Sequence, residues 1–357
     1  MTASQEPTRN WLRDQANRLD ETAELAGEIV PRLAEVGFFG IGVPRESGGA
    51  GGDVCDAIDA IAGVAEASLT AAFVFWGHRA FIEYLLHTPN HALAARWLPA
   101  LLRGERAGAS GLSNAMKFLS GIESLQIEAV ADGEGWRLNG ALAWITNLRP
   151  QGYVAAAAVR MPGDAPPAII AFRGEGEGVQ RSADLDLMAL RASNTAAVQL
   201  RNVRIDASDV IHADARQYLP AVRPHFLGLQ CGMSIGLARV SLRSARQLSA
   251  DGRGPLPASV DVQQRALEET TAQLLEGIRD GRFKTNAALM FRLRIRLADI
   301  VQQAIMLELQ ASGGRAYLRS QDGDFARRWR EAAFIPIVTP SLTQLQMELQ
   351  KQTAQAA

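Results

Sequence analysis

Two histidines are the side chains of this chain best suited to proton transfer, because an imidazole changes its protonation state near neutral pH. His225 lies near the start of a long helical pattern, where it could act as a base or have no chemical role. His78 lies among aromatic residues, where a lone histidine commonly belongs to the core. The aromatic residues around it are Phe73, Phe75, Trp76 and Phe81. Both histidines are candidates for catalysis, each with a structural alternative.

Metal-binding chemistry is not expected. We expect none of the five histidines to pair with a carboxylate one helical turn away, and no H-x-x-H motif is present. The two cysteines, Cys55 and Cys231, are far apart and lack C-x-x-C spacing. A disulfide framework and a cysteine zinc site are therefore not expected, and a reducing compartment fits.

The composition limits the classes of protein to consider. The chain has 357 residues, of which 47% are hydrophobic, and a formal net charge of −1. These values indicate a soluble globular protein with room for two or three subdomains. Because basic residues are not in excess, nucleic acid is not an expected partner. No apolar run approaches the roughly 18 residues that cross a membrane, and we expect no membrane partner and a cytoplasmic location.

Residues 110–211 carry the patterns of β-strands. Apolar residues recur at every second position from 125 to 131, which is the period of a half-buried strand. Residues 132–135 supply a turn, because Asp and Gly tolerate positive φ, and the Asn-Gly pair at 139–140 is a second turn signal. The pattern predicts an antiparallel sheet with meander connections.

Helical periodicity precedes and follows these strands. Residues 8–104 show one-sided apolar patterns, interrupted at Pro31, where we expect one helix to end and another to begin. Residues 46–52 contain so many glycines that a compact structural loop is expected. After the strands, long amphipathic stretches occupy 261–277 and 286–312.

The strand-rich region contains the run G-W-R-L-N-G-A-L-A-W-I-T-N at residues 135–147. This run resembles the β-domain of the acyl-CoA dehydrogenase superfamily, whose members bind FAD. The glycine-rich run ending at residue 52, the segment 188–205 and the turn at 311–317 resemble other parts of the same family, in the same order. The resemblance implies an α+β fold, acyl-CoA dehydrogenase-like, in three parts. These are an N-terminal helical domain (1–104), a middle antiparallel β-domain (105–212) and a C-terminal four-helix bundle (213–357).

The resemblance also implies which residues would contact the flavin ring. Trp144, Ile145 and Thr146 are similar to the strand that packs against the isoalloxazine. The Thr146 hydroxyl is similar to the group that hydrogen-bonds flavin N5, where a hydroxyl can donate or accept as the ring changes state. Ser113 stands in the loop that opens the β-domain, where the family has a threonine at the flavin.

Further expectations concern the rest of the cofactor and the assembly. Arg191 matches a family arginine near the flavin, or is a surface residue in an ion pair. The family's pyrophosphate motif R-x-x-F-G is not recognisable, and 251–255 is the nearest stretch; Gln264 or Gln263 matches the glutamine that follows it. In the family a neighbouring subunit helps to hold FAD, and the long C-terminal helices need partners. We therefore expect a homo-oligomer, a dimer or tetramer.

The family's usual catalytic glutamate is missing. Thr339 stands at its position, and a threonine is not a base at neutral pH. Some members carry the glutamate instead on the helix that enters the bundle, and the corresponding region here has His225. His225 could replace the carboxylate.

Three functions are compatible with these residues. The leading expectation is a FAD-dependent oxidoreductase that oxidises an acyl-CoA-like thioester at its α and β carbons and passes hydride to flavin N5. The second is a monooxygenase of the same superfamily that uses supplied reduced flavin, with FMN as a possible cofactor. That branch of the superfamily lacks the glutamate and often uses His and Ser near the flavin. His78, His225 and Ser113 could supply these side chains. The third is a non-catalytic member that keeps only the scaffold.

Overall fold

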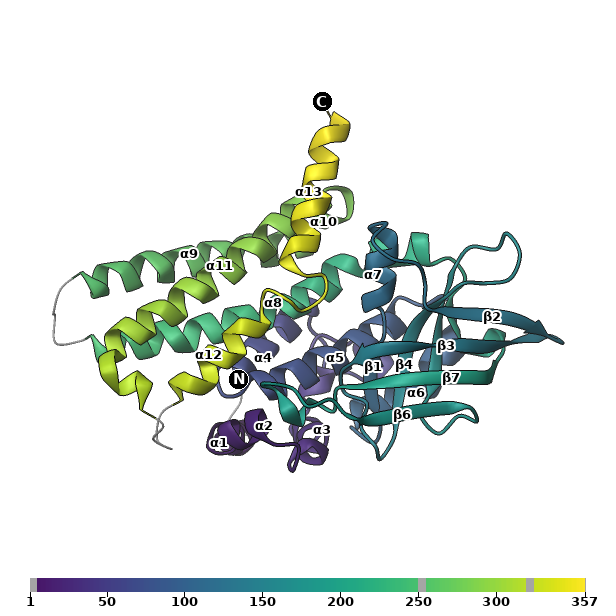
Figure 1. Ribbon diagram of the computed structural model, residues 1–357, viewed down its shortest axis with the longest axis horizontal. Coiled ribbons are helices and arrows are strands. Elements are labelled where there is room, and N and C mark those ends of the chain that lie inside the picture. Colours follow the sequence, from purple (N-terminus) through teal and green to yellow (C-terminus); the bar gives the residue numbers. More distant parts are fainter. Residues whose placement is uncertain (1–4, 250–254, 319–323, 357) are drawn as a thin grey trace.

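The computed structural model describes residues 5–249, 255–318 and 324–356. Helices come first, strands occupy the middle of the chain and helices return after them. The strands gather at one end of the molecule and the longest helices at the other (Figure 1). The expected fold class, with a helical N-terminal part, a β middle part and a helical C-terminal part, is confirmed. The boundaries expected at residues 104 and 212 stay predictions.

The first helical part is centred on α5, which is buried along almost its whole length and therefore lacks a polar face. The Asp53 side chain accepts hydrogen bonds from the N–H groups of Cys55 and Asp56 and so begins α4, and Ser68 caps α5. The helices of this part are α1 (Glu6–Asp14), α2 (Ala16–Glu21), α3 (Ala26–Glu35), α4 (Val54–Ala65), α5 (Leu69–Leu86) and α6 (His91–Leu102).

Two local expectations in this half of the chain are wrong. The helix α3 continues through Pro31 instead of breaking there. A proline removes one intrahelical hydrogen bond, and here the burial of Ile29, Val30 and Leu33 stabilises the helix around it. The loop expected at Ser113 is instead a short helix, α7 (Ser113–Leu119).

The strands form two four-stranded sheets, with orders β1-β4-β5-β8 and β2-β3-β7-β6. The antiparallel character is confirmed except at β1, which pairs in parallel with β4 from Ala107 opposite Tyr153. The sheets therefore do not follow the expected meander throughout, because strands distant in the sequence lie next to each other. The strands are β1 (Ala107–Ser110), β2 (Ile127–Asp132), β3 (Gly135–Ile145), β4 (Tyr153–Val159), β5 (Ala168–Arg173), β6 (Val179–Asp184), β7 (Ala196–Ile205) and β8 (Val210–His212).

The Asn-Gly pair at 139–140 is not a turn, because β3 runs through it. Gly140 has a φ of 141°, and a Cβ there would overlap the carbonyl oxygen of Gln126 on the neighbouring chain segment. The register between β3 and β7 shifts between Leu138 and Gly140. The glycine therefore marks a β-bulge, which is the other common use of glycine in a strand pattern.

The second helical part contains the longest helices, and α8 packs against both α4 and α11. The predicted amphipathic stretches lie within α9 and nearly coincide with α11. These helices are α8 (Ala215–Leu248), α9 (Leu256–Arg279), α10 (Arg282–Thr285), α11 (Ala287–Ser312), α12 (Phe325–Phe334) and α13 (Leu342–Ala356). Among the helices of the described residues, none combines the length and the apolar character that crossing a membrane requires.

A row of glycines on α8 brings this helix against α4. A Cβ on Gly232 would lie 2.7 Å from the carbonyl oxygen of Ile58, and one on Gly236 would overlap the carbonyl oxygen of Ala62. These two glycines lie one helical turn apart on the same face of α8. The two helices therefore approach to backbone contact, which only glycine permits here.

The close approach predicts the effect of the substitution Gly236→Ala. The added methyl group cannot fit without moving α8 away from α4, so the free energy of unfolding should fall by about 1–3 kcal/mol despite the better helix propensity of alanine. Urea unfolding followed by circular dichroism measures this change. Gly314→Ala is the matched control, because a Cβ at Gly314 has no atom within 4 Å. Equal stabilities of the two variants would contradict the packing described.

Candidate functional site

A cavity of about 510 Å³ lies between the β-sheet part, the helices α5 and α8, and the segment that joins α12 to α13. Its size falls within the range of small-molecule and cofactor sites. The side chains that line it are mostly apolar, with a few hydroxyl groups and two cationic side chains, those of Lys117 and Arg330. The lining residues include Phe73, Trp76, Ser110, Ser113, Trp144, Thr146, Met188, Leu190, Thr195, Phe226, Phe334, Ile337 and Thr339.

A row of hydroxyl groups forms one wall of the cavity. Thr146 Oγ1 lies 3.1 Å from Thr195 Oγ1, and Ser193 Oγ lies 2.8 Å from the same Thr195 oxygen. The pairing of Ile145 with Ala196 across β3 and β7 places the two threonines opposite each other. Each hydroxyl can donate or accept, so the row can satisfy either a donor or an acceptor on a ligand at this wall.

A second hydroxyl pair closes the cavity on another side. Ser113 Oγ, at the start of α7, donates to Thr339 Oγ1 across 3.0 Å. Thr339 comes from the segment between α12 and α13, more than 200 residues later in the chain. This contact joins the β-sheet part to the C-terminal part at the cavity.

The position of Thr339 is set by polar groups behind it. Gln230 Nε2 on α8 donates to the Thr339 carbonyl oxygen at 2.9 Å, and Gln230 Oε1 accepts from Arg294 Nε on α11 at 2.9 Å. Arg294 Nη2 donates to the Ile335 carbonyl oxygen at 2.7 Å. Arg294 is fully buried, and this burial lowers the pKa of its guanidinium from the ordinary value.

Large apolar side chains around the cavity remain open to solvent. Trp144, Met188 and Ile337 are 63%, 73% and 66% exposed, and all three line the cavity. Exposed apolar surface around a hollow marks a binding site. This arrangement of apolar walls and hydroxyl groups suits a largely apolar ligand that carries a few polar atoms.

Known proteins resemble this chain in sequence. The family model described as acyl-CoA dehydrogenase, N-terminal domain, matches residues 3–105. A probable acyl-CoA dehydrogenase of Mycobacterium tuberculosis (strain ATCC 25618 / H37Rv) is 29% identical over 240 residues, which cover 66% of this chain and 61% of that protein. Both matches support membership of the acyl-CoA dehydrogenase superfamily.

Solved structures of low sequence identity share the fold. The glutaryl-coenzyme A dehydrogenase in complex with glutaryl-CoA has a TM-score of 0.80 at 18% identity, over 100% of this chain and 96% of that chain. The nitrososynthase from Micromonospora carbonacea var. africana also has a TM-score of 0.80, at 19% identity over 99% and 97% of the two chains. The match to the curated relative described above spans about three fifths of its length.

The cavity brings together three of the six residues expected to hold the cofactor in this superfamily member. Ser113, Trp144 and Thr146 line it. Ile145, between two of them, has its side chain buried in the sheet, because successive strand residues point to opposite faces. This cavity therefore does not provide the contact that was expected between Ile145 and the flavin ring.

The other two expected cofactor residues lie outside the cavity lining. Arg191 Nη1 forms an ion pair of 2.7 Å with Asp186, as the surface alternative anticipated. Gln264 is half-buried on α9 and donates to Glu268 at 2.7 Å. The stretch 251–254, the greater part of the nearest match to a pyrophosphate motif, lies outside the described residues.

The expectation of a catalytic His78 needs correction. His78 is fully buried and stacks on Phe39, with 3.8 Å between ring centroids. Its Nδ1 accepts from the Gly108 N–H at 3.1 Å, so the proton lies on Nε2, 3.0 Å from the Leu101 carbonyl oxygen. Burial lowers the pKa of His78 to about 3. The neutral ring is a structural hydrogen-bonding group that joins α5 to β1 and α6.

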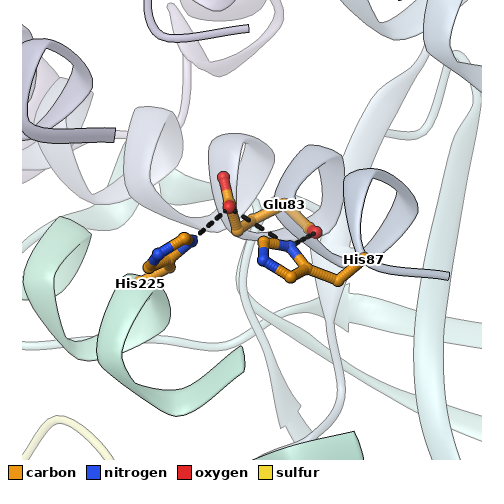
Figure 2. A group of neighbouring side chains, drawn as sticks. All are labelled: Glu83, His87 and His225. Carbon is orange, nitrogen blue, oxygen red and sulfur yellow. Dashed lines mark hydrogen bonds and ion pairs between the residues drawn. The ribbon is translucent and has the colours of Figure 1, made fainter. Parts of the chain in front are cut away.

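His225 also lies outside the cavity lining, although the next residue, Phe226, is part of it. The imidazole faces α5, where its Nδ1 lies 2.6 Å from Glu83 Oε1 (Figure 2). Nothing in this placement brings the ring to Thr339. Among the described lining residues there is neither a carboxylate nor a histidine.

Two groups of polar residues were not predicted from the sequence. Glu83 on α5 and His87, directly after the end of α5, are four residues apart and form a pair, so the expectation that no histidine pairs with a carboxylate one turn away is wrong. That spacing was available in the sequence. Gln230 and Arg294 were missed because each lies in an apolar helical pattern, where only the fold reveals its partners.

The buried, neutral His78 predicts a specific dependence of stability on pH. The unfolded chain gains a proton on this imidazole below its ordinary pKa of 6.5, whereas the folded protein does not until about 3, so the free energy of unfolding falls as the pH falls. At pH 5 the loss from this residue is roughly 2 kcal/mol.

The substitution His78→Gln, which keeps a donor and an acceptor, should reduce the loss of stability between pH 7 and pH 5. Urea unfolding at several pH values measures the slope, so an overall loss of stability in the variant does not obscure the result. His91→Gln, at an exposed histidine, should keep the wild-type slope. If the His78→Gln variant kept the wild-type slope, His78 would not be the residue that causes the loss of stability between pH 7 and pH 5.

Proposed function

We propose that this chain is a flavin-dependent oxidoreductase whose flavin ring lies in the cavity beside Trp144 and the hydroxyl row. Membership of the superfamily supports the cofactor class, and the apolar walls with hydroxyl groups along one edge support the place. FAD is the expected form, and FMN is the alternative. A bound flavin would supply the two-electron chemistry, for which the chain itself has no redox group in the cavity lining.

The residues of the chain would bind and orient the ring. The Thr146 hydroxyl, already paired with Thr195, can turn to donate to the polar edge of the ring or to accept from it. Trp144 and Met188 offer exposed apolar surface to a ring face, and their burial under the cofactor would contribute to binding. The Ser113–Thr339 pair would lie at the substrate side, where it can position a substrate by hydrogen bonding.

The observation that carries the choice of reaction in this proposal is the pair of hydroxyls at Ser113 and Thr339. Oxidation of an acyl thioester at the α and β carbons requires a base for the α-proton, and a general base contributes about 10²–10⁴ in rate. The lining residues of the described chain include no carboxylate and no imidazole, and His225 faces Glu83 instead. The geometry therefore favours a reaction that needs no base of this kind.

The reaction that the geometry supports best is oxidation of a substrate by oxygen with supplied reduced flavin. The similarity in fold to a nitrososynthase is compatible with this proposal. The second candidate is dehydrogenation of an acyl-CoA-like thioester, which the name of the Mycobacterium tuberculosis relative and the matching family model favour. The expected dimer or tetramer and the cytoplasmic location stay predictions.

Anaerobic mixing with acyl-CoA distinguishes the two reactions. The purified protein, loaded with FAD or FMN, is mixed without oxygen with saturated acyl-CoA thioesters of several chain lengths and with glutaryl-CoA. We expect the visible flavin band to persist, because no side chain in the cavity takes the α-proton. With reduced flavin supplied by a flavin reductase, we expect the protein to bind the reduced form and to consume oxygen faster than free flavin does.

Bleaching by any acyl-CoA would overturn the oxygen-dependent reaction in favour of dehydrogenation. Thr339→Glu is the matched variant, since it restores a carboxylate beside Ser113, and bleaching in this variant alone would support the missing-base explanation. A protein that binds neither oxidised nor reduced flavin would overturn the whole proposal and leave the non-catalytic scaffold.

The hydroxyl row predicts the effect of Thr146→Ala on the cofactor. Loss of one hydrogen bond to the ring, worth about 1 kcal/mol, should weaken flavin binding about fivefold and leave the fold intact. Titration of flavin fluorescence measures the dissociation constant, and circular dichroism checks the fold. Thr285→Ala, at a threonine of α10 outside the cavity lining, is the control. Unchanged flavin affinity would mean that Thr146 is only a residue of the sheet.

A further inference from the structure

Glu83, His87 and His225 form a cluster outside the cavity, at the end of α5 (Figure 2). Glu83 and His87 lie one helical turn apart, and His225 comes from α8. One potential ligand atom from each of the three lies within 4.8 Å of the other two. We propose that these residues bind one divalent transition-metal ion, of the class that includes Zn²⁺ and Co²⁺.

The donor set and the access to solvent support this proposal. Two imidazoles and one carboxylate are ligands that suit Zn²⁺, with further positions left for water. The Glu83 side chain is 4% exposed, that of His225 is 19% exposed and that of His87 is 30% exposed. An ion can therefore enter from the side of the histidines, while the carboxylate holds it from within.

The carboxylate is oriented so that one oxygen faces the histidines. Arg79 Nη1 donates to Glu83 Oε2 at 2.6 Å, whereas Oε1 lies 2.6 Å from His225 Nδ1 and 3.3 Å from His87 Nδ1. Arg79 is held in turn by the Gly42 carbonyl oxygen at 3.0 Å. A hydrogen-bonded partner that orients a ligand is a regular feature of metal sites.

The charges of the cluster allow an ion and limit its affinity. Burial would raise the pKa of Glu83, but attraction to Arg79 and the hydrogen bond with His225 outweigh it and hold the pKa at about 2, so the carboxylate is ionised. Its charge is shared with Arg79, which weakens its attraction for a cation. The His87 ring, which now lies 3.0 Å from the Glu83 carbonyl oxygen, must turn toward the ion.

The role of the ion would be to join α5 to α8. His225 precedes Phe226, whose carbonyl oxygen accepts from Trp76 Nε1 at 3.4 Å, and both aromatic side chains line the cavity. An ion held by the cluster would fix the α5–α8 contact next to the cavity without touching the bound ligand. This inference is independent of the proposed reaction, because none of the three ligands lines the cavity.

Metal titration of the purified full chain tests the proposal. The protein is first treated with a chelator and then titrated with Zn²⁺ by calorimetry and with Co²⁺ by visible absorption, which reports imidazole and carboxylate coordination. We expect one ion per chain and an increase in the melting temperature with Zn²⁺. The variants His87→Ala and His225→Ala should each bind at least about tenfold more weakly.

His91→Ala removes an exposed histidine outside the cluster and should bind the ion as the wild type does. Glu83→Gln is not used alone, because it leaves the buried charge of Arg79 without its partner and endangers the fold. Failure to bind one ion per chain at tens of micromolar metal, or binding that survives loss of both His87 and His225, would overturn the proposal and leave a hydrogen-bonded cluster.

Discussion

The buried guanidinium of Arg294 is the contact on which the shape of the cavity depends. Its two hydrogen bonds with other segments go to neutral oxygen atoms, those of Gln230 and of the Ile335 carbonyl. A buried charge that loses such partners is costly, so these hydrogen bonds must form together when the helices pack. Through Gln230 they also fix the carbonyl group of Thr339, and this places its hydroxyl at Ser113.

The cavity is a composite of segments that are distant in the sequence. The sheet part contributes the hydroxyl row, α5 and α8 contribute aromatic walls, and the segment before α13 contributes Ile337 and Thr339. The described lining residues include hydroxyl groups, one amide and two cationic side chains, but no carboxylate and no imidazole. The chain therefore positions its ligands, and the chemistry proposed for it comes from the cofactor and from oxygen.

Much of the fold could be predicted because hydrophobic period and glycine carry strong local signals. The run from 135 to 147 located the strand that carries Trp144 and ends directly before Thr146, and both residues line the cavity. The same glycine signal was misread at Gly140, because a turn and a bulge require the same freedom of the backbone.

The candidate site was predicted less completely, because the hydrogen-bond and ion-pair partners of polar side chains come from segments that only the fold brings together. His78 and His225 were suggested by their chemistry, yet the first is neutral in the core and the second faces a carboxylate on another helix. Ile145 follows from the alternation of a strand and could have been placed correctly. The roles of Arg294 and Gln230 could not be predicted, since the sequence around an arginine in an apolar stripe does not indicate its hydrogen-bond partners.

The backbone contact between α4 and α8 has a consequence for how the chain reaches its native state. The residues that meet, such as Ala62 and Gly236, are separated by the whole β-sheet part. Such a non-local contact requires a large loop to close before it contributes any stability, which slows folding. At synthesis rates of about 5–20 residues per second, α8 is synthesised on the order of ten seconds after α4. During that interval the apolar face of α4 is exposed, and protection by a chaperone would prevent it from associating with other nascent chains.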